Sequence, residues 1–596
     1  MSDEQIRAAA WDLISDDSSK QMAGFEAIRQ CGGSAAKILL EVAHEWNEES
    51  WNRWLGRTAG GGYSDALSRS LADSNAIDAL SEAIIDPNPV FRGFAAFTLS
   101  EINDPRVPEL LHQAFDDQDV VVRGHSIHGM MKYGDQKSFE LVLSALQDSN
   151  VDVRCRAAFA MRYIGGVEAV EPLIRMLQDP EEIVVVISIV SLGMLGAEAA
   201  VEPVIDALES ESEKIRNCAI MNGLSRIADQ RAVEPLAKQV VINLNKHAIV
   251  SALETLCRID PRESFDLFIQ MLKHPDSYVR CKCADLLRKL KADRATNALF
   301  EALEDTSPGV RLSAAFALMN SGDPRVLDAL VEILHLGPNL QPSKIRIVGI
   351  SPDKEDANRS LRQNSAKALG TLGDSKAIEP LAEALNDKTT SIQAAISLSK
   401  LGDDRGLGYL LERLRNADKY DKREIIEAIG ETKSAQALPV IVEKLQDEDF
   451  INRAYATRCI YAALAKIGTK EAISALEEIM TNGGESACWS AEELAYVGYE
   501  PGINYLCSHI ESNFNDQKKD LPSVLKKIDH PRAKNLLLSL LDHPSADIAV
   551  ATIQELQESN DPEIKQAIKA KLQDPDRRVQ TAAFIAINGM NRRGII

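Results

Sequence analysis

The sequence predicts an all-α fold, an α-solenoid of short helical hairpins, from three observations. Arginine recurs at a fixed period, because Arg92, Arg123 and Arg154 are each 31 residues apart, as are Arg280 and Arg311. Apolar residues follow these arginines at helical spacing. The composition is 45% hydrophobic but only 5% aromatic, which suits close-packed helices. At 596 residues the chain exceeds the usual size of a single core, and a repeat array accounts for that length.

The Arg-bearing half of each unit is predicted to be one amphipathic helix. The units read DPNPVFRGFAAFTLSEIND, DDQDVVVRGHSIHGMMKYGD and DSNVDVRCRAAFAMRYIGG. Apolar or small residues recur three, four, seven and ten places after the Arg, as in Ala157, Ala158, Met161 and Ile164. This spacing places them on one stripe of a helix.

The other half of the unit is predicted to be a second short helix. It reads AVEPLIRMLQD, AVEPVIDALES, AVEPLAKQV and AIEPLAEALND, with Pro172, Pro203, Pro235 and Pro380 in its first turn. Proline is tolerated there because its missing N–H needs no partner within the helix. A hairpin of about 31 residues cannot bury its own apolar stripe, so each repeat must stack on the next.

Aspartate precedes the arginine by six residues in four units, as Asp86, Asp117, Asp148 and Asp305. We expect these residues to form a ladder of charge-assisted hydrogen bonds between adjacent hairpins. Their role is then structural, and they are not read as a catalytic acid and base.

The repeat pattern resembles a known family. The phrase DxxxxVR followed by AxxxLGxLGD, as in SAKALGTLGDSKAIEPLAEALND, is similar to the short HEAT-like repeats (PBS-lyase-type HEAT repeats) of the E/F-type phycobilin lyases and many prokaryotic HEAT proteins. The likeness covers most of residues 73–596 and blurs after about residue 390. It implies an α-solenoid (superhelix) of HEAT-like helical hairpins and leaves the activity open.

Regularity divides the chain into four predicted parts. These are an irregular helical N-terminal cap at 1–72, regular HEAT-like repeats at 73–334, an inserted loop at 335–360 with a β-like run at 344–350, and more divergent repeats at 361–596. The cap contains Trp46, Trp51 and Trp54 and a glycine run at 60–62 that lacks the Lys-Ser/Thr of a P-loop. The insertion is either part of a binding face or a tolerated surface loop.

The register also predicts which positions face away from the core. At 100° per residue, positions two, five and nine after the Arg point opposite to the apolar stripe. The resemblance implies that this Arg-bearing helix lines the concave surface. We call the large, mostly apolar or aromatic residues at these positions in four consecutive repeats the predicted binding face. They are Phe94, Phe97, His125, His128, Arg156, Phe159, Tyr163, Ile187, Val190 and Met194.

An exposed patch of this kind is typical of a protein-binding hot spot. By contrast, the repeat beginning at Arg280 places Lys282, Asp285 and Lys289 at the same positions. The alternative is that strong curvature or a different register buries the predicted binding face in the core.

Charge and targeting signals narrow the partner classes. The chain has 67 Lys and Arg against 89 Asp and Glu, a formal charge of −22, which disfavours nucleic-acid binding. The nine cysteines show no C-x-x-C spacing, and no signal peptide or apolar stretch of about 18 residues is seen. We therefore expect an acidic cytoplasmic protein with no membrane contact.

No catalytic constellation stands out. His125 and His128 have a spacing that can hold one metal, but the matching positions of the adjacent helices supply no third ligand. HEAT-like iron hydroxylases that modify lysine use several His-Glu dyads, whereas only His44-Glu45 occurs here. We expect no cofactor and no metal site, and the sequence favours a nonenzymatic role without settling it.

Two functions follow from these observations. The first is a noncatalytic scaffold or assembly factor that grips a protein partner on its concave surface. The second, which depends on the family resemblance, is a bilin-lyase-like protein or chaperone that holds a tetrapyrrole for a client protein, with Arg pairing with its propionates.

Overall fold

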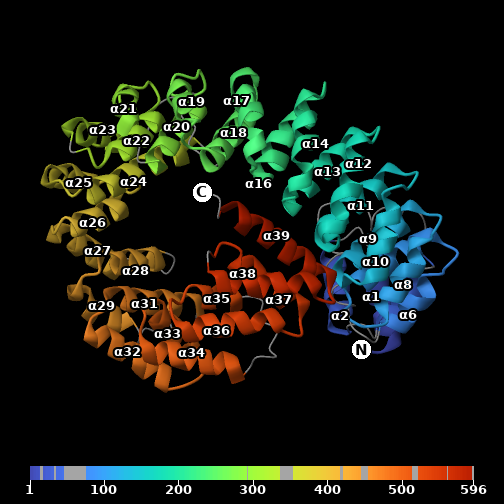
Figure 1. Cartoon of the computed structure of the whole chain (residues 1–596). Helices are drawn as coiled ribbons and strands as arrows, with labels where there is room; N and C mark the ends of the chain where they lie inside the picture. Colours follow the sequence, from blue (N-terminus) through green and yellow to red (C-terminus); the bar gives the residue numbers. More distant parts are fainter. Residues whose placement is uncertain are drawn as a thin grey trace. The chain divides into compact units, whose positions relative to one another are not determined.

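The structure, a computed structural model, is helical throughout the part of the chain that it describes. The described residues are 1–13, 18–31, 35–43, 45, 76–290, 293–321, 323–335, 354–416, 421–444, 454–512, 521–559 and 561–593. No strand occurs within these ranges, and none of their helices is both long and apolar enough to cross a membrane. The all-α prediction is therefore confirmed for these residues (Figure 1).

The chain forms two compact units. Unit 1 comprises Met1–Ile227 together with Leu556–Ile596, and unit 2 comprises Ala228–Glu555. The boundaries between the two units therefore differ from the boundaries of the four parts predicted from repeat regularity. The reason is that the C-terminal helices pack against the early repeats.

Unit 1 begins with three helices that precede the regular repeats, α1 (Asp3–Asp12), α2 (Ser18–Cys31) and α3 (Ala36–Ala43). Its hairpins follow in chain order. They contain α6 (Ile77–Ala83), α7 (Pro89–Glu101), α8 (Val107–Phe115), α9 (Val120–Tyr133), α10 (Gln136–Ala145), α11 (Val151–Ile164), α12 (Val170–Arg175), α13 (Glu182–Leu195), α14 (Val201–Asp206), α15 (Glu213–Cys218) and α16 (Ser225–Ile227). The C-terminal part adds α38 (Pro562–Ala570) and α39 (Arg577–Arg593).

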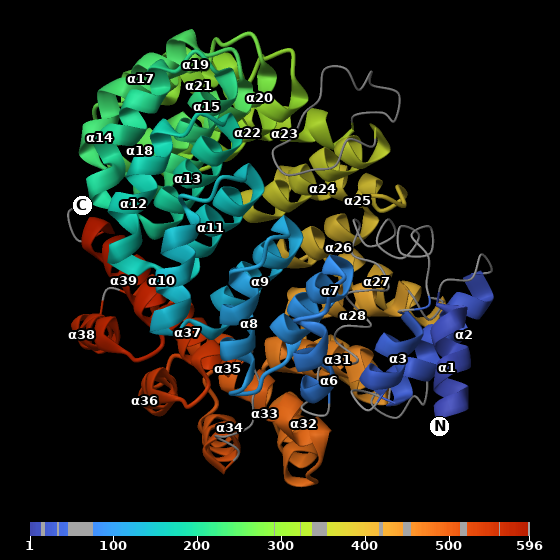
Figure 2. The same cartoon turned by 90° about the vertical axis from the view of Figure 1, so that its right-hand side faces the viewer.

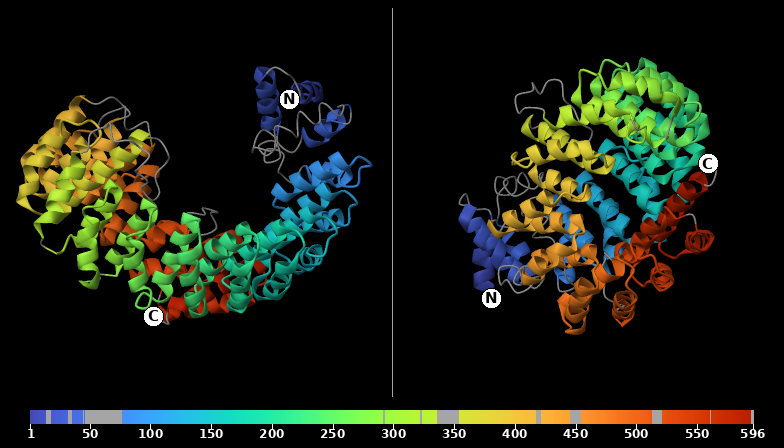
Figure 3. Two further views of the ribbon diagram at one scale, coloured as in Figure 1. Left: turned by 90° about the horizontal axis from the view of Figure 1, so that it is seen from above. Right: turned by 90° about the vertical axis from the view of Figure 1, so that its left-hand side faces the viewer.

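Unit 2 continues the pattern of helix pairs. Its helices are α17 (Val233–Ile242), α18 (Lys246–Ile259), α19 (Phe265–Met271), α20 (Ser277–Lys289), α21 (Thr296–Ala302), α22 (Pro308–Leu318), α23 (Pro324–Leu334), α24 (Lys354–Leu372), α25 (Ile378–Ala384), α26 (Ser391–Lys400), α27 (Asp404–Asn416), α28 (Asp421–Thr432), α29 (Leu438–Lys444), α31 (Ala454–Ile467), α32 (Lys470–Thr481), α33 (Glu485–Tyr496), α34 (Glu500–Ser512), α35 (Leu521–Lys526) and α36 (Pro531–Ser539). Helix α37 (Ala546–Leu556) ends at the unit boundary. Figure 3 shows the same succession from two other sides.

The local signals in the sequence mark real helix starts. Pro172, Pro203, Pro235 and Pro380 are each the third residue of their helix, in α12, α14, α17 and α25. The Arg-bearing helices begin behind polar caps, as when the Asp119 carboxylate accepts hydrogen bonds from the N–H groups of Val121 and Val122. Such caps satisfy N–H groups that the first helical turn leaves without partners.

The Asp–Arg ladder is confirmed by direct contacts. Arg154 donates from Nε and Nη2 to the Asp179 carboxylate at 2.8 and 3.1 Å, and from Nη1 to the carbonyl of Asp148 at 3.0 Å. Arg154 thus binds both a backbone carbonyl in the turn before its own helix and the carboxylate of the aspartate in the corresponding turn of the next hairpin. The same pairing joins Arg92 to Asp117, Arg123 to Asp148, Arg280 to Asp305 and Arg362 to Asp387.

The ladder also has gaps. Val185 and His247 stand where the period places arginine. Between the two gaps, the helix between α15 and α16 contains a π-helical turn, Ala219–Leu224. The boundary between the two units follows directly, at Ile227 and Ala228.

The C-terminal segment packs on the early repeats within unit 1. Helix α39 contacts α11, the 3₁₀ turn Gly166–Ala169 and α13 (Figure 2). The Arg577 N–H donates to the carbonyl of Gly134 at 3.1 Å, and the Asn588 side chain donates to the carbonyl of Leu195 at 3.3 Å. Residues more than 390 positions apart in the sequence are therefore neighbours in the fold.

Several sequence predictions fall partly outside the described residues. The tryptophans and the glycine run of the predicted cap fall in residues 46–75, and the predicted β-like run falls in residues 336–353. Both ranges lie outside the described residues. The remaining end of the predicted 335–360 loop is helical, because α24 begins at Lys354.

Candidate functional site

The predicted binding face is accessible to solvent. Its ten residues lie on α7, α9, α11 and α13, and none of them is buried. Phe159 and Tyr163 are each 38% exposed, whereas Ala157 and Met161 of the opposite stripe of α11 are fully buried. The predicted register is confirmed, and the alternative that these residues belong to the core is wrong.

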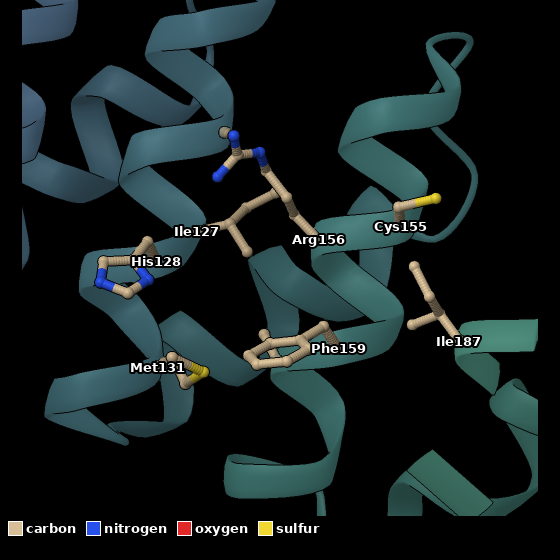
Figure 4. A pocket seen from close by; sticks show the side chains of 9 residues that line it. Ile127, His128, Met131, Cys155, Arg156, Phe159 and Ile187 are labelled. Carbon is tan, nitrogen blue, oxygen red and sulfur yellow. The ribbon is translucent and has the colours of Figure 1, made fainter. Parts of the chain in front are cut away.

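An apolar pocket lies between α9 and α11, with α13 beside it, and has a volume of about 250 Å³. We call it the α9–α11 pocket. Its lining residues are Gly124, Ile127, His128, Met131, Cys155, Arg156, Phe159, Ala160 and Ile187 (Figure 4). Four residues of the predicted binding face are among them, namely His128, Arg156, Phe159 and Ile187.

Sequence reasoning missed the other five lining residues. Ile127 lies four positions after Arg123, on the stripe predicted to face the core, and is buried, whereas Gly124 and Met131 lie one and eight positions after Arg123. A pocket between two helices is lined by the residues that each helix turns toward the other. These residues could have been predicted only by considering the adjacent helices together, since the pattern of one helix alone identifies only the residues opposite the core.

A guanidinium stacks on the exposed aromatic residues of α11. The Arg162 Cζ lies 3.7 Å from the Phe159 ring centroid and 4.8 Å from that of Tyr163. Its Nη2 donates to the Tyr163 hydroxyl at 2.9 Å. These contacts hold both rings in place at the surface, which lowers the conformational entropy lost when a partner covers them.

The predicted residues of α7 and α9 meet at another aromatic contact. The rings of Phe97 and His125 lie 5.2 Å apart, at an interplanar angle of 59°. Burial, followed by the positive charges of Arg156 and His128, lowers the pKa of His125 to about 4. The imidazole is therefore neutral at pH 7 and packs as a flat, weakly polar ring.

The remaining members of the predicted binding face extend the surface beyond the pocket. Phe94, Val190 and Met194 are partly exposed and do not line the α9–α11 pocket. One further residue was missed at the same register, because Met221 lies five positions after Arg216 and is 37% exposed. The exposed apolar column therefore continues one repeat further than the sequence prediction placed it.

The site offers little for covalent or metal chemistry. Burial raises the pKa of the Cys155 thiol, so this pocket residue is protonated at neutral pH and is a poor nucleophile. Among the residues that the structure describes, no three or more His, Cys, Asp or Glu side chains are grouped to hold a metal ion. His44 of the His-Glu dyad lies outside the described residues.

The stacked hairpins and their Asp–Arg ladder define this chain as an α-solenoid. A model of HEAT repeats matches it at residues 77–148, 107–191, 139–222, 265–340, 354–421 and 409–495. These matches cover more than half of the sequence, and the chain belongs to the HEAT repeat family.

Two curated proteins show more distant similarity. Phycocyanobilin lyase subunit alpha of Picosynechococcus sp. is 29% identical over 215 residues, covering 33% of this chain and 74% of that protein. Deoxyhypusine hydroxylase-B of Oryza sativa subsp. japonica is 24% identical over 291 residues, covering 48% of this chain and 83% of that protein. The first similarity supports the resemblance to PBS-lyase-type repeats.

Solved structures share the fold over the full length. The chain described as the Kap95:Nup1 complex aligns with a TM-score of 0.52 at 12% identity, covering 100% of this chain and 96% of that chain. At this identity the likeness concerns the fold alone.

Proposed function

We propose that this chain is a noncatalytic scaffold or assembly factor whose predicted binding face grips an apolar segment of a partner protein. The observation that carries the proposal is the α9–α11 pocket, which lies at four of the residues that the repeat register singles out. Phe159 of the pocket lining and the nearby Tyr163 both remain exposed although they are large aromatic residues. Such patches on soluble proteins commonly mark interaction sites.

The size of the pocket favours a side chain over a large cofactor. Pockets for drug-sized ligands measure roughly 300–1,000 Å³, whereas this one measures about 250 Å³. It can enclose one large apolar side chain and leaves a tetrapyrrole mostly outside. The exposed surface around it adds contact area over several repeats, as peptide-binding grooves do.

The proposal is tested by replacing Phe97, Phe159 and Tyr163 with alanine together. Proteins retained by the wild-type chain from its native cell are identified, and their binding to the variant is then measured with purified components. We expect at least a tenfold loss of affinity, about 1.4 kcal/mol or more. The thermal unfolding midpoint should change little, because the three residues lie outside the core.

A matched control uses other exposed apolar residues. Val241, Ile242 and Leu244 of unit 2 are 62%, 57% and 97% exposed. Their triple alanine variant should bind the partner normally. Loss of binding in this control, with normal binding by the first variant, would move the functional surface to unit 2.

A tetrapyrrole carrier is the second candidate, supported by the similarity to phycocyanobilin lyase subunit alpha. Titrating the chain with a free linear tetrapyrrole distinguishes the two. A saturable absorbance shift that Phe159→Ala abolishes would favour the carrier, and an unchanged spectrum favours the scaffold.

A further inference from the structure

Arg156 is an exposed cation at the edge of the α9–α11 pocket. It makes no hydrogen bond or ion pair with another residue that the structure describes. The ladder arginines of α9 and of α11 itself, in contrast, each bind a carboxylate, as Arg123 binds Asp148 and Arg154 binds Asp179. Arg156 is thus available to a carboxylate from outside.

The position of Arg156 depends on a glycine in the adjacent helix. Its side chain extends from α11 toward α9 (Figure 4) and passes over Gly124. A Cβ added to Gly124 would lie 2.8 Å from Nε and 2.9 Å from Cδ of Arg156. The absence of a side chain at 124 therefore lets the guanidinium lie across the upper wall of the pocket.

Arg156 places a positive charge at the pocket, although the chain as a whole has a formal charge of −22. This charge acts on its surroundings, because after burial Arg156 is the first of the charges that lower the pKa of His125, and Asp119 acts in the opposite direction. The nine residues that line the α9–α11 pocket include no aspartate or glutamate. An acidic group approaching this surface is therefore attracted locally.

The rest of the pocket is apolar. Ile127, Met131, Phe159 and Ile187 form its walls around about 250 Å³. We propose that the pocket receives a large aliphatic or aromatic side chain of a partner segment, while Arg156 binds an Asp or Glu carboxylate of that same segment. This inference rests on the proposed function and specifies the chemistry of the partner. Neighbouring side chains on one helical face lie roughly 5–6 Å apart, which suits a partner that presents both groups.

The test is a selection on the full-length chain with phage-displayed random peptides about 12 residues long, enough for three helical turns. Peptides whose binding is lost with Phe159→Ala are kept, because they bind at the pocket. We expect these peptides to share a large apolar residue with an Asp or Glu within four positions of it. Enrichment of Lys or Arg beside the apolar residue would overturn the proposal.

Variants of the pocket then test the carboxylate contact. Arg156→Glu should weaken the selected peptides at least tenfold, whereas Arg156→Lys should weaken them less, because lysine keeps the charge but loses the bidentate geometry. Gly124→Ala keeps the charge but displaces the guanidinium, and should weaken binding severalfold without lowering the unfolding midpoint. Equal affinity for wild type and Arg156→Glu would exclude the carboxylate.

The outcomes also separate this inference from the function on which it rests. If peptides depend on Phe159 but are indifferent to Arg156, the pocket binds protein segments and only the predicted partner chemistry is wrong. If no selected peptide depends on Phe159, the binding site itself is wrong. Binding of a free tetrapyrrole that Arg156→Glu abolishes, without any Phe159-dependent peptide, would assign the guanidinium to a tetrapyrrole carboxylate.

Discussion

The ladder arginines stabilise the fold through bonds to two repeats at once. The Arg154 and Asp179 side chains are only 13% and 5% exposed, so their ion pair is largely shielded from water. Burial alone would raise the pKa of Asp179, but hydrogen bonds from Arg154 and from the N–H of Glu181 lower it below its ordinary value. The carboxylate therefore stays charged and depends on the guanidinium.

Arg154→Ala should lower the free energy of unfolding by about 1 to 3 kcal/mol, because it leaves the Asp179 carboxylate without its partner. Thermal and denaturant unfolding measure the loss. Arg106→Ala is the matched control, since Arg106 is 50% exposed and pairs with Asp104 at the surface. Exposed pairs contribute little, so its effect should be much smaller than that of Arg154→Ala. Equal effects of the two variants would remove the energetic role of the ladder.

The neutral state of His125 predicts a pH dependence of stability. Burial and neighbouring positive charges hold the folded pKa at about 4, below the ordinary value of 6.5. Between these values the unfolded chain binds the proton and the folded chain does not, so stability is lost as the pH falls from 6.5 toward 4. At pH 5 the loss from this residue is about 1 to 2 kcal/mol.

Comparing denaturant midpoints at pH 7 and pH 5 tests this expectation. His125→Gln removes the titrating group while keeping a polar side chain of similar length, so its midpoint should fall less between the two pH values. The same fall in wild type and variant would show that other groups cause the acid sensitivity.

At the scale of the elements, close packing of neighbouring helices leaves no room for a side chain at particular glycines. A Cβ added to Gly193 of α13 would lie 1.8 Å from the backbone oxygen of Asn222, in the π-helical turn Ala219–Leu224. A backbone atom cannot move aside as a flexible side chain can. This contact is the physical reason why only glycine fits at 193.

Gly193→Ala should therefore destabilise the chain by at least about 2 kcal/mol, although alanine favours a helix. Gly408→Ala is the control, because Gly408 lies in α27 with nothing within 4 Å of an added Cβ. There the higher helix propensity of alanine should stabilise by about 0.5–1 kcal/mol. A thermal shift measurement on both variants is sufficient, and a neutral Gly193→Ala would show that the turn adapts.

At the scale of the molecule, one buried arginine secures the C-terminal helices to the early repeats of unit 1. Arg577 donates from Nε to the Gln136 amide oxygen and from Nη2 to the Glu168 carboxylate, both at 2.9 Å. Its Cζ lies 3.8 Å from the centroid of the Phe139 ring. Its side chain is only 8% exposed.

Arg577→Ala should loosen this contact without unfolding the repeats, because it removes two hydrogen bonds and the stacking at once. Hydrogen exchange of residues 562–593 should become faster, and exchange should also increase at the N-terminal end of α10 and at the C-terminal end of α11, where the contacts of Arg577 lie. Arg578→Ala is the control, since the Arg578 guanidinium forms an ion pair with Asp576 of the same turn. Unchanged exchange in Arg577→Ala would mean that other contacts of α39 hold the segment.

The sequence by itself determined the hairpins, their register and the Asp–Arg ladder. Each depends on a spacing that repeats along the chain, either the 3.6-residue period of a helix or the 31-residue period of the unit. The sequence also predicted that the ten residues of the predicted binding face are partly exposed, because the apolar stripe that faces the core fixes which positions of the same helix face away from it.

Only the tertiary structure decided the pocket and the docking of the C-terminal helices. The pocket requires the flanks of two helices to face each other, with Gly124 making room for Arg156, and no single-helix pattern contains that information. The contact between Arg577 and Gln136 joins residues 441 positions apart, far beyond any repeat period. Such a contact within unit 1 joins parts of the chain that are far apart in sequence, which local spacing does not specify.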